Sequence, residues 1–208
     1  MFKGCTSLVT AEELPATTLA GYCYYSMFEG CTSLVSAPDI LAERPLQISC
    51  FEAMFKNCSL LSTNIPDLSK FTTLADYCYE EMFSGCSSLV NAPALPALTT
   101  TYGCYRNMIK DCVNLITIPA LPAYGTAYSS CYSYMFEGCS KIKMSTTSGG
   151  EYTNIYRIPS SSNKSFSTFY GGYTGPWYNM FNNTGGTFTG PMDIRSFLTL
   201  YTSNTIVT

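Results

Sequence analysis

The nine residues Cys78-Tyr79-Glu80-Glu81-Met82-Phe83-Ser84-Gly85-Cys86 recur along this chain. The same pattern occupies segments 23–31, 50–58, 104–112 and 131–139, and residues 1–5 match its second half. The methionine at its centre stands at positions 1, 27, 54, 82, 108 and 135, so copies are separated by 26, 27, 28, 26 and 27 residues. A tandem period of this size predicts a solenoid, in which each repeat buries its apolar surface against its neighbours.

The composition argues against several classes of protein. The 208 residues have a formal net charge of −3 and 12% charged side chains, so we expect no nucleic acid partner. No apolar run is long enough to span a bilayer, and no signal peptide is recognisable at the start. The absence of histidine removes the commonest general base and a usual zinc ligand. We therefore expect no enzyme activity, no catalytic or metal-binding residues and no cofactor, and the sequence leaves the binding residues unknown.

Each repeat reads as one short strand and one short helix, which predicts an α/β solenoid. Residues 32–38 are partly β-branched and end at a proline, as a brief strand would. Leu19, Cys23, Met27 and Cys31 recur every four residues, which indicates one buried face of a helix. A core column follows the strand positions of successive repeats: Leu8, Leu34, Leu61, Leu89, Leu115 and Ile142.

The eleven cysteines form two columns on this repeat. Ten of them make five pairs eight positions apart, and Cys5 is the second member of a pair whose first member would precede Met1. In a helix, eight residues would separate the two Cα atoms by roughly 12 Å, too far for a disulfide within one repeat. Bridges between repeats and metal binding are alternatives, but no CxxC doublet occurs. We predict reduced, buried cysteines that pack as small apolar side chains.

An aromatic residue follows the first cysteine of every pair. It could form a ladder on which a sugar or a partner side chain stacks, or it could pack between repeats. Because it adjoins a cysteine column expected to be buried, we favour packing. Its members are Tyr24, Phe51, Tyr79, Tyr105 and Tyr132.

The repeats divide the chain into two regions. Residues 1–144 are expected to form the solenoid, with about five full repeats and a partial first one. Residues 145–208 are expected to hold a degenerate repeat and a β-rich C-terminal cap, because 177–184 echo the motif with Thr184 in place of a cysteine. Since Met1 lies inside a repeat, we expect the chain to be a fragment of a longer protein.

The strings MFEGCTSLVSAP (27–38), MFSGCSSLVNAPALPALTT (82–100) and CYSYMFEGC (131–139) resemble the BspA-like leucine-rich repeats of bacterial surface proteins. The resemblance covers residues 1 to about 144. It implies a right-handed, leucine-rich-repeat-like stack at the cell surface, used in adhesion or protein binding, and it brings no catalytic residues. The sequence departs from it at Asn57 and Asp111, where most repeats have glycine, and at Ile109.

Two functions from different classes are compatible with these features. The first is a monomeric cell-surface recognition module for protein or glycan ligands on a host or neighbouring cell. The second is a structural spacer or stalk in a larger surface or phage-tail assembly. The residues that flank the inward strand positions are small and uncharged, which leaves the spacer open. They are Val9, Thr10, Val35, Ser36, Val90, Asn91, Ile116 and Thr117.

Overall fold

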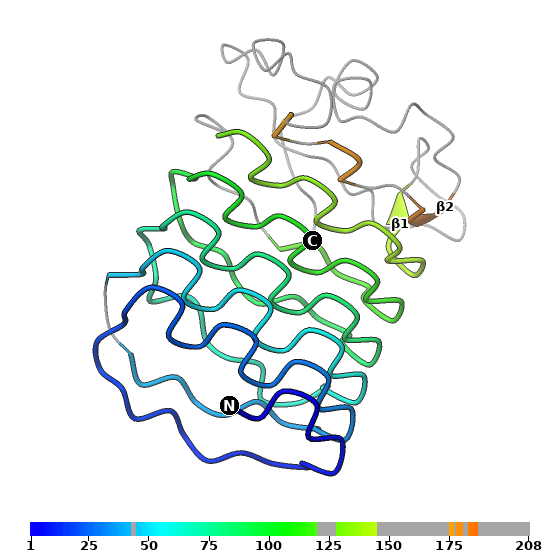
Figure 1. Cartoon of the computed structure of the whole chain (residues 1–208). Coiled ribbons are helices and arrows are strands. Elements are labelled where there is room, and N and C mark those ends of the chain that lie inside the picture. Colours follow the sequence, from blue (N-terminus) through cyan, green and yellow to red (C-terminus); the bar gives the residue numbers. More distant parts are fainter. Residues whose placement is uncertain (43–44, 120–127, 145–174, 177, 181–182, 187–208) are drawn as a thin grey trace.

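The repeats form a stack of coils, one coil for each repeat (Figure 1). This computed structural model describes residues 1–42, 45–119, 128–144, 175–176, 178–180 and 183–186. The chain begins in the blue coil at the bottom of the view and climbs through cyan and green coils to β1 (Figure 1). Neighbours in the stack are therefore neighbours in the sequence, one repeat apart.

The predicted α/β solenoid with a helix and a strand in each repeat is wrong. The described residues contain no helix, and their only strands are the two-residue β1 (Lys143–Met144) and β2 (Gly185–Gly186), which pair in parallel. The strands expected in the cap fall in 187–207, outside the described residues. Two isolated parallel bridges add to the pairing, Leu14 with Ile40 and Ser36 with Thr63.

Consecutive β-turns replace the predicted helix. In residues 75–86, every second N–H donates to the carbonyl three residues earlier, whereas a helix would use the carbonyl four residues earlier. Alternate turns place their third residue in the left-handed region, as in type II turns: Tyr77 (φ 56°), Glu81 (φ 55°) and Gly85 (φ 75°). We call this segment of each coil, which ends at the second cysteine, the turn ribbon.

The remaining N–H groups of a turn ribbon bind the next coil. Between residues 77 and 86, the even-numbered N–H groups bond within the coil and the odd-numbered ones bond the next coil, so none is left without an acceptor. The bonds to the next coil run from Tyr77 to Tyr102 (2.9 Å), Tyr79 to Cys104 (3.1 Å), Glu81 to Arg106 (2.9 Å), Phe83 to Met108 (2.8 Å) and Gly85 to Lys110 (2.8 Å).

The same register continues beyond the gap in the described residues. The N–H groups of Tyr132, Tyr134 and Phe136 donate to the carbonyls of Pro176, Tyr178 and Met180 at 2.8–2.9 Å. Residues 176 and 178–180 therefore stack on the ribbon of 131–139 in the way that each coil stacks on the one before it.

A repeat of four residues explains why the cysteine segment folds as turns. Two side chains pack in the apolar core and the next two point away from it, although some of these, such as Ser84, are still buried. The second residue that points away has positive φ. Glycine adopts this conformation freely, and Asn and Asp tolerate it better than most residues. Asn57 (φ 61°) and Asp111 (φ 59°) occupy the glycine position of their repeats. Their departure from the repeat pattern thus preserves the backbone conformation.

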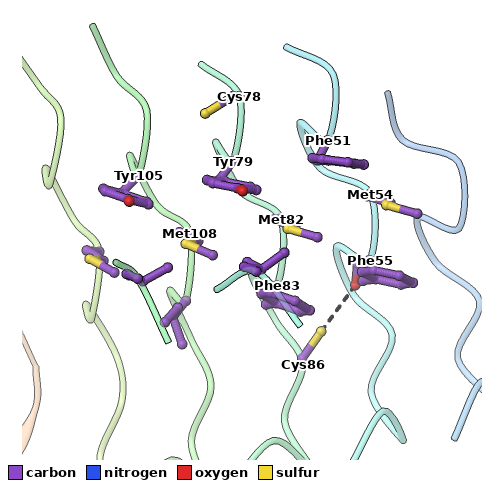
Figure 2. Close-up of a cluster of buried hydrophobic side chains, with 14 of the residues drawn as sticks. Phe51, Met54, Phe55, Cys78, Tyr79, Met82, Phe83, Cys86, Tyr105 and Met108 are labelled. Atoms are coloured by element: carbon purple, nitrogen blue, oxygen red, sulfur yellow. Dashed lines mark hydrogen bonds between the residues drawn. The ribbon is translucent and has the colours of Figure 1, made fainter. Parts of the chain in front are cut away.

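Two aromatic stacks run through the core. In one, Phe51 and Tyr79 lie 5.9 Å apart between ring centroids and are nearly parallel, and Tyr79 lies 5.9 Å from Tyr105. In the other, Phe55 and Phe83 lie 5.7 Å apart (Figure 2). All these rings are buried. The packing interpretation of the aromatic column is confirmed, and the alternative of a stacking platform for ligands is wrong.

The leucine column is buried as predicted except at Leu8, which is only partly buried, and its leucines do not lie in strands. Leu34, Leu61, Leu89 and Leu115 are at most 1% exposed. They directly follow the ribbon, where the N–H of each leucine bonds the carbonyl of the preceding cysteine, as from Leu89 to Cys86 at 3.0 Å. The local turn, rather than a sheet ladder, therefore directs these side chains into the core.

All eleven cysteines are free, as predicted, and nine of them are buried. The prediction of burial is wrong for Cys5 and Cys23, which are exposed in the first coils. The argument from helical rise does not apply, because the segment is not helical. The cysteines instead have a specific partner: the Cys86 thiol donates to the Phe55 carbonyl at 3.1 Å, in addition to the Cys58 N–H at 3.0 Å (Figure 2).

This thiol contact recurs at every member of the second cysteine column after Cys5. A small buried side chain with a weak S–H donor suits a carbonyl that has a second lone pair to offer. Burial raises the pKa of the Cys58 and Cys139 thiols to about 12. The remaining contacts, each 3.1 Å, are Cys31 to Phe2, Cys58 to Phe28, Cys112 to Phe83 and Cys139 to Ile109.

The outward glycines provide a test of the turn ribbon. Gly30→Ala and Gly85→Ala should both lower the free energy of unfolding by about 1–2 kcal/mol, because both positions have positive φ. Gly85→Ala should cost more, since the new Cβ would meet the Asn57 side-chain oxygen, whereas at Gly30 the nearest atom is 3.7 Å away. Denaturant melts should show the excess cost disappear in an Asn57→Gly background; an excess that persisted would contradict this packing.

The thiols provide a second test. In the native protein, Cys5 and Cys23 should react quickly with a thiol reagent, and the nine buried cysteines only after unfolding. The double variant Cys5→Ser/Cys23→Ser should lose the fast phase while keeping the slow one. A fast phase that included more than two thiols in the wild type would contradict the burial described above.

Candidate functional site

The outward side chains of the turn ribbons form one continuous face, which we call the ribbon face. Each coil contributes the two residues after the aromatic that follows its first cysteine, and the two residues before its second cysteine. Tyrosines just before the first cysteine extend the face. One of its columns contains Tyr25, Glu52, Glu80, Arg106 and Ser133, and another contains Lys3, Glu29, Lys56, Ser84, Lys110 and Glu137.

Ion pairs join adjacent coils across this face. The Arg106 Nε donates to the Glu80 carboxylate at 2.7 Å, although the two residues belong to different repeats. Stacking brings together charges that are about one period apart in the sequence. The other pairs are Lys3 with Glu29 (2.7 Å), Lys56 with Glu81 (2.6 Å) and Lys110 with Glu137 (2.8 Å).

Tyrosines lie among these charges. Tyr77 meets Tyr102 edge to face, with ring centroids 5.4 Å apart, and the Arg106 guanidinium lies over the Tyr77 ring at 5.6 Å. The Lys110 ammonium lies over Tyr134 at the same distance. Each contact joins adjacent coils. Cation–π contacts and ion pairs therefore hold Arg106 and Lys110 in fixed positions on the surface.

The charges on the ribbon face perturb one another. Burial raises the pKa of Glu80, and the nearby Glu52 and Glu81 carboxylates add to this effect, whereas Arg106 opposes it. The hydrogen bond to Glu137 raises the pKa of Lys110. Around Glu80, three carboxylates thus compete for the cations Lys56 and Arg106.

The residues that flank the predicted strand positions form a second surface, the corner column. Val9, Val35, Val90 and Ile116 are exposed and uncharged. They lie in one row, because the Val35 N–H donates to the Val9 carbonyl at 3.1 Å and the Ile116 N–H to the Val90 carbonyl at 3.0 Å. The corner column is narrow and, apart from these apolar side chains, carries Ser, Thr and Asn.

Potential metal ligands are scattered over the described part of the chain. No group of three potential metal ligands comes together among them. Each of the four ion pairs joins one cation to one carboxylate of an adjacent coil. No helix in the described part of the chain is long and apolar enough to cross a membrane.

Comparisons of the chain with protein families, with curated proteins and with solved structures found no match. The resemblance to BspA-like surface proteins therefore stays a prediction that rests on the repeat motif.

Sequence reasoning named no binding residues and missed the ribbon face. Glu80 and Glu81 are neighbouring acidic residues in the segment predicted as a helix, yet Glu80 is buried and bound to Arg106. A signal was present: each ion pair joins opposite charges 25–27 positions apart, as from Glu80 to Arg106 (26) and from Lys56 to Glu81 (25). Aligning the repeats by charge would have found these pairs.

The raised pKa of Glu80 makes a testable contribution to stability. A carboxyl group whose pKa is higher in the folded state stabilises the fold below its unfolded pKa, and this contribution is lost as the pH rises through the folded pKa. The wild type should therefore lose stability relative to Glu80→Gln between about pH 4 and neutrality. Denaturant melts across this range measure the difference, and a wild type that instead gained relative stability would show that the Arg106 pair dominates.

Proposed function

We propose that this chain is a non-catalytic recognition and adhesion module that binds protein or glycan ligands at a cell surface. The observation that carries the proposal is the ribbon face, on which tyrosines and cations are held in place by contacts between coils. Tyrosine and arginine are the residues that most often dominate binding surfaces, because they combine a large contact area with hydrogen-bonding groups.

The scaffold beneath the ribbon face supports this role. In the ribbon at 77–86, each backbone N–H is bonded either within its coil or to the next one. The outward side chains therefore start from a fixed backbone, and less conformational entropy is lost when a ligand binds. Loop-borne recognition surfaces usually lack this advantage.

We place the module outside the cell, as a part of an exported bacterial protein, because its motif resembles those of bacterial surface proteins. Buried free thiols are compatible with such a location. The thiolate is the reactive species, and burial raises the pKa of the Cys50 and Cys104 thiols to about 12. Such thiols are slow to oxidise even in an oxidising compartment.

A structural spacer is the second candidate, and the backbone ladder favours it. Hydrogen bonds along the stack axis link each described ribbon to the next, so a pulling force along the axis would be shared among many bonds. In this case the ribbon-face contacts would serve only to hold coils together, and the face would have no ligand.

Binding to immobilised ligands tests the proposed function. The purified chain should bind at least one member of a panel of mucin, collagen, and neutral and acidic polysaccharides, measured by interferometry. Tyr25→Ser/Tyr102→Ser should weaken that binding about tenfold or more, because both side chains are exposed on the ribbon face.

The corner column supplies the matched control. Val35→Thr/Val90→Thr also changes two exposed side chains on two coils and should leave binding unchanged. If the wild type bound no member of the panel, the result would count against the recognition function and in favour of the spacer. Loss of binding only in the corner-column variant would place the binding site on the corner column and not on the ribbon face.

A further inference from the structure

We propose that the ribbon face around Arg106 and Lys110 binds an acidic segment of a partner protein. This inference rests on the proposed recognition function and names its partner class. The chain as a whole carries a net charge of −3, so the cationic character of this region comes from how its ion pairs are arranged.

In these ion pairs the carboxylate lies deeper than its cation. The Arg106 side chain is 38% exposed and that of Glu80 only 9%, and the values for Lys110 and Glu137 are 33% and 15%. A partner that approaches these two pairs therefore meets each cation before its carboxylate, and the exposed Asp111 lies beside Lys110. The pair of Lys56 and Glu81 is different, because both side chains are equally exposed, at 28% and 29%.

Arg106 and Lys110 are prepared for a carboxylate ligand. They are four residues apart on one turn ribbon, so both project outward from the same coil. The contacts with Glu80 and Glu137, and the rings of Tyr77 and Tyr134, hold them in position. Guanidinium groups retain further N–H donors when one edge is bonded to a carboxylate, and charge-assisted bonds to a second carboxylate are strong.

The tyrosines favour a peptide over an acidic glycan. A sugar would stack on an open ring face, but Arg106 lies over Tyr77 and Lys110 lies over Tyr134. On its coil-facing side, Tyr77 packs so closely on Gly103 that a Cβ there would come within 2.6 Å of the ring. The two cations that cover these rings remain partly accessible, and they suit the carboxylates of Asp and Glu side chains.

Poly-L-glutamate is the probe. The wild type should bind immobilised poly-L-glutamate at low salt and less tightly at physiological salt, because screening weakens exposed charge pairs. Arg106→Gln/Lys110→Gln should weaken binding at least about tenfold, as expected for the loss of charge-assisted hydrogen bonds. Lys110→Gln alone should also weaken binding. Lys56→Gln is the matched control for this single variant, because each removes one positive charge from the ribbon face, and Lys56→Gln should change the affinity by less than about twofold.

A second variant covers the case in which Arg106→Gln unfolds the protein by leaving the buried Glu80 unpaired. Glu80→Gln/Arg106→Gln removes both charges, and melting temperatures verify that it folds. It should still bind poly-L-glutamate more weakly than the wild type. Equal loss in Lys56→Gln would overturn the assignment, because binding would then follow net charge alone.

Polygalacturonate forms the second arm of the experiment. Binding of this acidic glycan, but not of poly-L-glutamate, with the same sensitivity to Arg106 and Lys110 would overturn the inference in favour of a glycan. Binding of neither polyanion would also overturn it. The proposed function would still stand in that case if the wild type bound the ligand panel through the ribbon face, and it would fall only if the panel failed as well.

Discussion

The fold depends on the division of backbone N–H groups between two kinds of partner. Along a turn ribbon, alternate N–H groups close β-turns within the coil, and the others bond carbonyls of the next coil. Neither set of hydrogen bonds would stabilise a coil alone, because isolated turns are only marginally stable and an unpaired buried amide costs free energy. Stacking therefore completes the hydrogen bonding of each ribbon, and the coils are stable only as neighbours.

This division also determines what the side chains do. The four-residue repeat directs Met82 and Phe83 into the core and Ser84 and Gly85 outward, and the pattern recurs on the neighbouring coils. Like residues consequently form columns. Aromatic rings stack with centroids 5.4–5.9 Å apart, and each thiol of the second cysteine column contacts the equivalent carbonyl of the preceding coil. On the outer side, the same columns bring opposite charges together, which produces the ribbon face from residues that are distant in the sequence.

Either a helix or a series of β-turns could explain the spacing of the cysteine segment, and the structure has the β-turns. Leu19, Cys23, Met27 and Cys31 recur every four residues, which a helix of 3.6 residues per turn accommodates only over a short length. A strict period of four, which the buried Tyr24 and Phe28 share, fits turns better, because two turns use four residues. Glycine, Asn57 or Asp111 at the last outward position marked the left-handed residue of those turns.

The sequence by itself determined the stacking period and the core columns, because these follow from repetition and apolar spacing. It did not determine the secondary structure, since the choice between a helix and a turn ribbon depends on whether alternate N–H groups find carbonyls on the next coil. It also did not reveal the ribbon face. Only the stacked structure places Arg106 over Tyr77 and beside a buried Glu80, because such contacts depend on the register between coils.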